Sequence, residues 1–286
     1  MRVNPVIVVM AVVGAAGLNR AGIAGTATGV LHVNDREIAL RHAYAVAEVP
    51  ELAFPGQPKD AYDLIISDRA LTDAERGCRT LLMRNVGRGD VHGVILTITP
   101  GKQDTSHGAI LYGRNPAFFS VTGTNDQYKI EAKTLTAGHV SGRVWTPKDV
   151  LLDLPGSPAV NIRYDATVDA DVVRPGAVTA TLTGEAAMKS PQMRAVAAFF
   201  GAMRSGDAAA LSSACAIGQG ELFTGPDGRQ FLAGVKQGVP DLAKVRALKV
   251  IVRGGLAVVT GKAPEPVGEV AMKCVLQGGR WRVSLN

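Results

Sequence analysis

The sequence predicts a two-domain protein, in which an N-terminal all-β sandwich or open barrel with one helix precedes a C-terminal α+β domain. Its length of 286 residues exceeds the usual size of a single domain. Aromatic residues make up only 5%, whereas 33 glycines and 15 prolines favour many strands and turns over long helices. Apolar and polar residues alternate as in strands over much of residues 28–173, whereas the second domain begins with a helical period after residue 190.

The first residues have the pattern of a secretory signal peptide. An unbroken apolar run of 13 residues extends from Val6 to Leu18, and small residues follow it. Such a run would span about 20 Å as a helix, less than the ~30 Å hydrocarbon core of a membrane. We therefore expect residues 1–24 to be a cleaved signal and the mature protein to be periplasmic or secreted, without a transmembrane segment. A buried N-terminal strand is the alternative.

The first domain is expected over residues 28–173. Strand-like alternation over residues 28–49 is interrupted by Asn34-Asp35, which indicates a hairpin because both residues tolerate positive φ. Seven or more short strands with turns between them favour an antiparallel sandwich or an open barrel. The further strands are expected at residues 63–68, 91–99, 109–112, 118–122, 128–135, 139–145 and 160–172.

One helix is predicted in this domain. Thr72 and Glu75 have the spacing of a capping box, in which each side chain binds the backbone N–H of the other residue. We therefore expect a helix over residues 73–85 that stops at Gly87.

Residues 174–189 have little periodicity and are interpreted as a linker to a second domain over residues 190–286. This domain is expected to begin with a helix whose apolar face carries Met193, Val196, Phe200 and Met203. Shorter helices are expected after Asp207 and over residues 228–238. Two hairpins with Gly-Gly turns should then supply strands at residues 250–253, 256–260, 270–276 and 281–285.

Short motifs add a family resemblance to this pattern. Phe199-Phe200, Gly206-Asp207 and Gly279-Arg280-Trp281-Arg282-Val283, together with the order of helices and strands, resemble the nuclear transport factor 2-like (cystatin-like cone) superfamily. The resemblance covers residues 190–286 and implies an α+β cone, with helices packed on a curved antiparallel sheet. Gly29-Val-Leu-His-Val-Asn and Ser141-Gly142-Arg143 resemble uncharacterised exported bacterial β domains, a likeness that implies no function.

No motif for nucleophilic catalysis or phosphate binding is complete. A serine-hydrolase elbow has a glycine two residues before its nucleophilic serine. In residues 138–142, His139 occupies that position before Ser141. Residues 255–262 have five residues between their glycines where a phosphate-binding loop has four. We expect no catalytic residue, no metal and no cofactor. Five histidines remain, and none has metal-ligand spacing. They would form a metal site or supply a general base only if the fold brings them together: His32, His42, His92, His107 and His139.

The resemblance also indicates where a ligand would bind. Enzymes of the superfamily use an Asp or His inside the cone as a base, but the second domain contains no histidine. Among its seven acids, only Glu221 and Glu269 are expected to point inward. The expected ligand-binding residues are Phe200, Met203, Glu221, Phe231, Glu269 and Trp281.

Three cysteines occur after the expected signal: Cys78, Cys215 and Cys274. None has the spacing of a metal site. Cys215 and Cys274 both lie on apolar faces of their elements. We therefore expect either a disulfide between these two residues or two buried thiols.

Charge is distributed unevenly between the two domains. Residues 28–173 hold 15 Lys and Arg against 18 Asp and Glu, a balance of −3, whereas residues 174–286 hold 14 against 7, a balance of +7. Docking of the domains, an anionic partner, or no function at all would fit this asymmetry. Nucleic acid is not expected as a partner, because the basic residues between Lys236 and Arg253 have no interleaved aromatics.

These features predict an exported, non-catalytic protein that binds a small ligand or an envelope protein in a concave apolar pocket of the second domain. Two alternatives stay open. One is an isomerase- or dehydratase-type enzyme that uses an acid inside the cone, and the other is a purely structural envelope component.

Overall fold

The computed structural model describes residues 24–52, 58, 60–101, 105–112, 128–152, 159–224, 228, 230, 232–233, 239, 244–263 and 268–285. The chain divides into two compact units at Pro175 and Gly176, and each unit has its own sheet and core. Of the expected signal peptide, residues 1–23 lie outside the described residues. No helix in the described part of the chain is long and apolar enough to cross a membrane.

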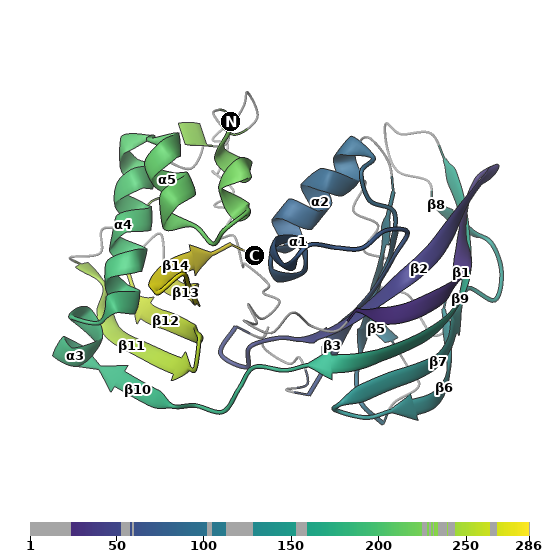
Figure 1. The fold of residues 1–286 in the computed structure, drawn as a ribbon, viewed down its shortest axis with the longest axis horizontal. Coiled ribbons are helices and arrows are strands. Elements are labelled where there is room, and N and C mark those ends of the chain that lie inside the picture. Colours follow the sequence, from purple (N-terminus) through teal and green to yellow (C-terminus); the bar gives the residue numbers. More distant parts are fainter. Residues whose placement is uncertain are drawn as a thin grey trace, which may run out of the picture. The chain divides into compact units, whose positions relative to one another are not determined.

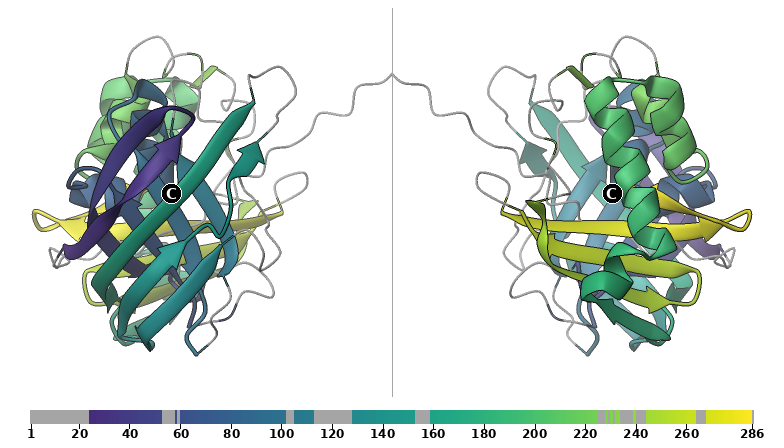
Figure 2. Two further views of the ribbon diagram at one scale, coloured as in Figure 1. Left: turned by 90° about the vertical axis from the view of Figure 1, so that its right-hand side faces the viewer. Right: turned by 90° about the vertical axis from the view of Figure 1, so that its left-hand side faces the viewer.

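The N-terminal unit consists mainly of one nine-stranded, almost entirely antiparallel sheet (Figure 1). Its strands follow the order β5-β4-β3-β2-β1-β9-β7-β6, and β8 pairs with β9. The sheet curls around one of its faces into a half-barrel, as Figure 2 shows. The strands are β1 (Gly25–Val33), β2 (Arg36–Ala47), β3 (Tyr62–Ser67), β4 (Gly93–Ile98), β5 (Thr105–Leu111), β6 (Lys129–Leu135), β7 (His139–Trp145), β8 (Val150–Leu152) and β9 (Val160–Val173).

Backbone geometry accounts for the first hairpin and for part of the curl. Asn34 has a φ of 51° in the turn between β1 and β2, which confirms the predicted hairpin. Gly25 and Gly29 of β1 lie so close to β9 that a Cβ atom would come within 2.3 Å of the Asp169 oxygen and 2.2 Å of the Asp165 oxygen. Only glycine fits at such positions, and the close approach lets the sheet bend.

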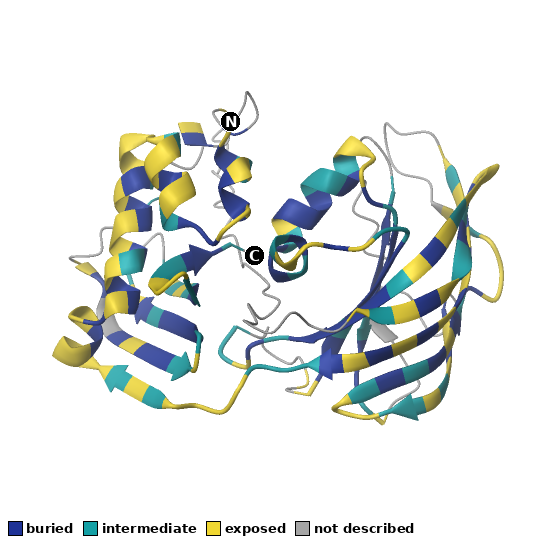
Figure 3. Cartoon of the chain, viewed as in Figure 1, coloured by how far each residue is buried: buried dark blue, intermediate teal, exposed yellow. Residues whose placement is uncertain are grey.

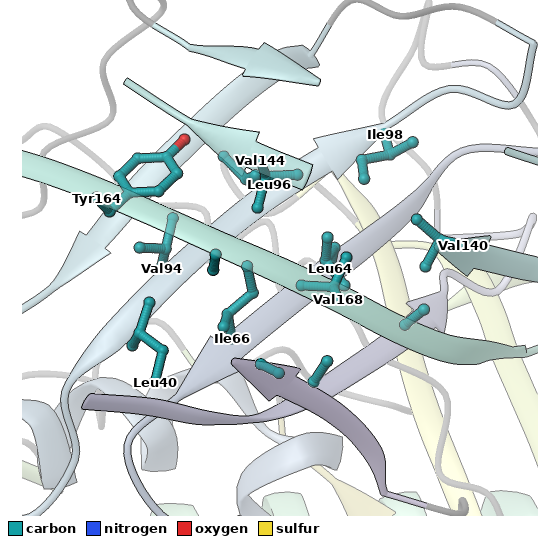
Figure 4. Packing of buried hydrophobic residues seen from close by; sticks show 14 of the residues in the cluster. Leu40, Leu64, Ile66, Val94, Leu96, Ile98, Val140, Val144, Tyr164 and Val168 are labelled. Carbon is teal, nitrogen blue, oxygen red and sulfur yellow. The ribbon is translucent and has the colours of Figure 1, made fainter. Parts of the chain in front are cut away.

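The concave face of the curled sheet carries the core of this unit. Alternate residues of β9 from Ile162 to Val172 are buried, while the residues between them are exposed, as the banding in Figure 3 shows. The same face of β2, β3 and β4 contributes Leu40, Leu64, Ile66, Val94 and Leu96 (Figure 4). Removing this continuous apolar surface from water is the main force that holds the half-barrel together.

Two short helices, α1 (Asp73–Gly77) and α2 (Arg79–Arg88), pack against the other face of β2 and β3. The Leu71 N–H donates to the Tyr44 hydroxyl at 3.0 Å, and Arg79 pairs with Asp63 at 3.8 Å. These contacts explain why β3 is buried on both faces.

The single helix predicted over residues 73–85 is therefore wrong in one respect, because it is broken at Cys78. The backbone of Cys78 is extended, with φ −142° and ψ 101°, and this ends α1. Its sulfur then accepts from the Leu81 N–H at 3.3 Å and caps α2. The second helix continues past the predicted stop and ends at Gly89, which has a positive φ of 78°.

Glu75 completes the predicted capping box and has only 3% of its surface exposed. Its carboxylate accepts hydrogen bonds from Arg69 at 2.5 Å, Asn85 at 2.7 Å and the Thr72 N–H at 2.8 Å. Burial by itself raises the pKa of Glu75, but the hydrogen bonds from Arg69, Thr72 and Asn85 outweigh it and lower the pKa to about 2. The charged carboxylate thus fixes the loop before α1 to both helices.

The C-terminal unit has a five-stranded antiparallel sheet in the order β10-β11-β12-β13-β14. Helix α4 lies across one face of this sheet (Figure 2). The elements are β10 (Ala180–Thr183), α3 (Gly184–Met188), α4 (Pro191–Ser205), α5 (Ala208–Ala214), a 3-10 helix (Gln219–Phe223), β11 (Arg246–Arg253), β12 (Leu256–Lys262), β13 (Glu269–Gln277) and β14 (Arg280–Ser284).

Helix α4 agrees with its predicted apolar face, since Met193, Val196 and Phe200 are buried against the sheet. Its ends follow ordinary capping chemistry: the Ser190 side chain accepts from the Met193 N–H, and Gly206 closes the helix with a φ of 74°.

The expected linker over residues 174–189 is only partly irregular. Residues 180–183 form β10, which pairs with β11, and residues 184–188 form α3. The linker prediction is corrected to residues 174–179. The predicted strand at residues 118–122 lies outside the described residues, as does most of the predicted helix over residues 228–238.

Candidate functional site

The interior of the C-terminal unit, where the sequence places a ligand, is a packed core in the described part of the chain. Phe199 contacts Phe200 and Phe223, with ring centroids 5.6 Å and 6.4 Å apart. Phe200 is buried among these rings, and Met203 and Trp281 are half-buried against the same cluster. Phe231 lies outside the described residues.

The two acids expected inside the cone are both exposed. Glu221 lies on the 3-10 helix and Glu269 begins β13, and their side chains face solvent. The prediction that they point inward is wrong. Glu185 and Asp207 are exposed as well, so the described residues of this unit place no carboxylate in its core.

Cys215 and Cys274 are fully buried in the core of this unit and form no disulfide. Val283 lies between them, because it pairs with Cys274 across the β13–β14 ladder and with Cys215 in an isolated bridge. Two strand spacings of about 4.8 Å put the two Cα atoms about 10 Å apart, beyond the reach of a disulfide. Burial raises the pKa of the Cys274 thiol to about 12, which keeps it protonated.

The N-terminal unit has a different kind of interior, which contains a phenol without a partner. Tyr164 points inward from β9, is fully buried, and its hydroxyl has no hydrogen-bond partner in the described structure. It lies at the same end of the core as Val94, away from Ile98 (Figure 4). Burial raises its pKa well above the ordinary value, and the neighbouring Tyr128 raises it further, so Tyr164 remains a neutral donor. Leaving such a donor unpaired costs about 1–3 kcal/mol.

Tyr62 is a second phenol of this kind, near the other end of the concave face. It is 1% exposed and its hydroxyl also has no partner in the described structure. Burial raises its pKa to about 12, although the charge of Arg174 opposes this. Tyr62 pairs with Ala47, close to where β2 meets Val173 of β9. Nine residues of strand separate that point from Tyr164, which corresponds to about 30 Å.

The two edges of the curled sheet are joined by a side-chain contact and by one backbone hydrogen bond, from the Gly101 N–H to the Leu135 carbonyl at 3.4 Å. Its edge strands β5 and β6 share no ladder in the described residues. Tyr128, just before β6, covers Gly108 of β5, where a Cβ atom would be 3.0 Å from the phenol ring and 3.2 Å from Leu96. We call this Tyr128–Gly108 contact the seam.

A row of polar residues lies at one end of the concave face. Asp68 follows β3, His92 precedes β4 and Tyr112 follows β5, and the three strands are paired in register. The His92 Nδ1 is 2.9 Å from one Asp68 carboxylate oxygen, and the His92 backbone N–H donates to the other at 2.9 Å. The rings of His92 and Tyr112 are 5.6 Å apart. About a quarter of each of the Asp68 and His92 side chains is exposed.

The Asp68–His92 pair fixes one tautomer of the imidazole. A carboxylate can only accept, so the proton sits on Nδ1 and the lone pair on Nε2. Nε2 can therefore accept a hydrogen bond or a proton. No hydroxyl or thiol within the described ranges contacts it, so the arrangement lacks the nucleophile of a catalytic triad.

A second histidine, His139, has carboxylate neighbours of its own. His139 lies on the exposed face between Asp171, at 2.8 Å, and Asp169, at 3.5 Å. No group of three or more His, Cys, Asp or Glu with metal-binding geometry occurs among the residues that the structure describes.

The sequence interpretation missed Tyr164, Tyr62 and the Asp68–His92 pair. A signal for Tyr164 existed: it is the one residue with a polar atom at the inward positions of β9 from Ile162 to Val172. The pair had no such signal, because its residues are 24 positions apart and meet only through strand pairing.

Comparison of the chain with protein-family models, with curated proteins and with solved structures finds no match. The assignment of function therefore depends on the chemistry of these two interiors.

Proposed function

We propose that this chain is an exported, non-catalytic binding protein, and that it holds an apolar ligand within the curled sheet of its N-terminal unit. The buried, unpartnered hydroxyl of Tyr164 is the observation that carries the proposal. Native proteins pair nearly all such groups, and an unpaired one calls for a partner from outside the chain. The lining around it is apolar, which suits a ligand of low polarity.

The seam supplies a route of entry. The lining side chains have almost no accessible area, so a ligand enters only when the edges of the sheet part. Separating β5 from β6 at Tyr128 and Gly108 disrupts side-chain packing and one backbone hydrogen bond, between Gly101 and Leu135, but no backbone ladder among the described strands. Opening there is less costly than breaking any hydrogen-bonded strand pair.

The N-terminal unit is preferred over the C-terminal unit for two reasons. The cone-like interior that the family resemblance implies is filled by Phe199, Phe200 and Phe223 in the described residues. Glu221 and Glu269, the acids expected to act as the base of an isomerase or dehydratase inside the cone, are both exposed. Export to the periplasm or the medium is supported by the apolar run from Val6 to Leu18.

The neutral dye N-phenyl-1-naphthylamine, which fluoresces in apolar surroundings, tests this function on the full chain. We expect the dye to bind the wild type. Ala166→Leu, an inward substitution on β9, should weaken binding at least about fivefold, because added methyl groups fill a packed interior. The matched outward substitution Thr167→Leu should leave binding unchanged. Absence of dye binding by the wild type, or equal binding by the two folded variants, contradicts the proposal.

A further inference from the structure

The chemistry around Tyr164 restricts the class of ligand, if the proposed binding function holds. We propose that the ligand is an uncharged lipid-like molecule that presents a neutral hydrogen-bond acceptor, such as an ester or ketone carbonyl, to the Tyr164 hydroxyl. Three properties of the site lead to this inference, namely the donor itself, the composition of the lining, and the charge at the nearby rim.

The Tyr164 hydroxyl offers its O–H to a ligand as a hydrogen-bond donor. Its phenol is fully buried and remains protonated, since burial raises its pKa well above the ordinary value. The hydroxyl donates to no group in the described structure. A ligand atom with a lone pair would satisfy it, whereas a pure hydrocarbon would leave it unpaired.

The described part of the lining offers no counter-ion for a charged ligand. The inward residues of β9 on either side of Tyr164 are Ile162 and Ala166, and those of β4 are Val94, Leu96 and Ile98. A carboxylate or phosphate buried there would lose its hydration without gaining a paired charge. Among the described neighbours, the phenol of Tyr128 adds to the effect of burial and raises the pKa of Tyr164 further.

The rim adds a negative charge at the same end of the face. Asp68 and His92 lie directly beyond Val94, and Figure 4 places Tyr164 at the Val94 end. Arg69, the cation next to Asp68, is already bound to Glu75 through two hydrogen bonds. The Asp68 carboxylate therefore disfavours an anionic head group near Tyr164.

Two ligands of equal chain length, methyl dodecanoate and dodecanoate, separate the neutral from the anionic head group. In displacement of N-phenyl-1-naphthylamine from the full chain at pH 8, we expect the ester to bind at least about tenfold more tightly than the carboxylate. Tyr164→Phe should weaken ester binding about threefold to tenfold, because one hydrogen bond is lost. Tyr44→Phe removes a hydroxyl on the opposite face of the sheet and should leave ester affinity unchanged.

The outcomes distinguish this inference from the function on which it rests. If neither the dye nor the ester binds, the proposed function itself is wrong. If the dye binds but dodecanoate matches or exceeds the ester, the function stands and the neutral ligand is refuted. Unchanged ester affinity in a folded Tyr164→Phe variant also overturns the role of Tyr164.

Discussion

Asp68 binds His92 twice, because one carboxylate oxygen faces the imidazole Nδ1 and the other accepts the backbone N–H of the same residue, both at 2.9 Å. The side chain and the main chain of His92 are thus held by a single acceptor. This arrangement positions the imidazole next to Tyr112 at the end of the concave face.

Replacing Asp68 by Asn should change the tautomer of His92. The amide can still accept the backbone N–H through its oxygen, but it then presents an NH₂ donor to Nδ1. We expect the neutral imidazole to move its proton from Nδ1 to Nε2, which ¹⁵N NMR of the ring nitrogens detects. His139, which faces Asp171, is the internal control and should not change. An unchanged His92 spectrum would show that the pair does not set the tautomer.

Glu75 should make folding stability dependent on pH in the acid range. Its pKa falls from 4.5 to about 2 on folding, so the unfolded chain binds more protons between these values. The stabilisation is complete above about pH 5 and is lost as the pH falls through the folded pKa, by about 2–3 kcal/mol. Urea unfolding at pH 6 and pH 3 should show a smaller loss in Glu75→Gln than in the wild type. Equal losses would contradict the coupling.

The three cysteines should not react with alkylating reagents in the folded protein. Cys78, Cys215 and Cys274 are buried and form no disulfide, and burial raises the pKa of Cys274 to about 12. Mass spectrometry after iodoacetamide treatment at pH 8 should show no adduct on the native chain and three adducts in denaturant. A Cys215–Cys274 disulfide, seen as an unmodified pair in denaturant, would refute the separation of these residues by Val283.

Removing the Tyr164 hydroxyl should stabilise the ligand-free protein. Tyr164→Phe deletes an unpaired buried donor, so the free energy of unfolding should rise by about 1 kcal/mol. Tyr44→Phe is the matched control, because its hydroxyl accepts from the Leu71 N–H, and its loss should destabilise by about 1 kcal/mol. Urea denaturation measures both values. A destabilised Tyr164→Phe variant would mean that this hydroxyl has a partner in the free protein.

Local patterns predicted those elements whose signals are themselves local. The Asn34-Asp35 turn, the alternation of β9 and the apolar face of α4 depend on neighbouring residues only, and all three agree with the structure. The break between α1 and α2 at Cys78 could not be predicted from local patterns, because helical periodicity continues across this residue. Strand β10 was missed because its four residues are defined by pairing with β11, about 70 positions away.

The candidate site was harder to predict for the same reason. Glu221 lies on a 3-10 helix of only five residues and Glu269 is the first residue of β13, so a one-position change in orientation decides between core and solvent. The unpartnered state of Tyr164 depends on residues from several strands, and the sequence shows only that a tyrosine interrupts an apolar series.

The pairing of β1 with β9 determines when the half-barrel can form. Val30 pairs with Asp165, 135 positions further along the chain, and β9 also holds β7 and the end of β2. Strand β9, which joins the two halves of the sheet, is therefore synthesised after all the remaining strands of the sheet. Contacts of such large sequence separation form slowly, since a long loop must close first. Folding of this unit is accordingly a late event, completed only after residue 173 has been released.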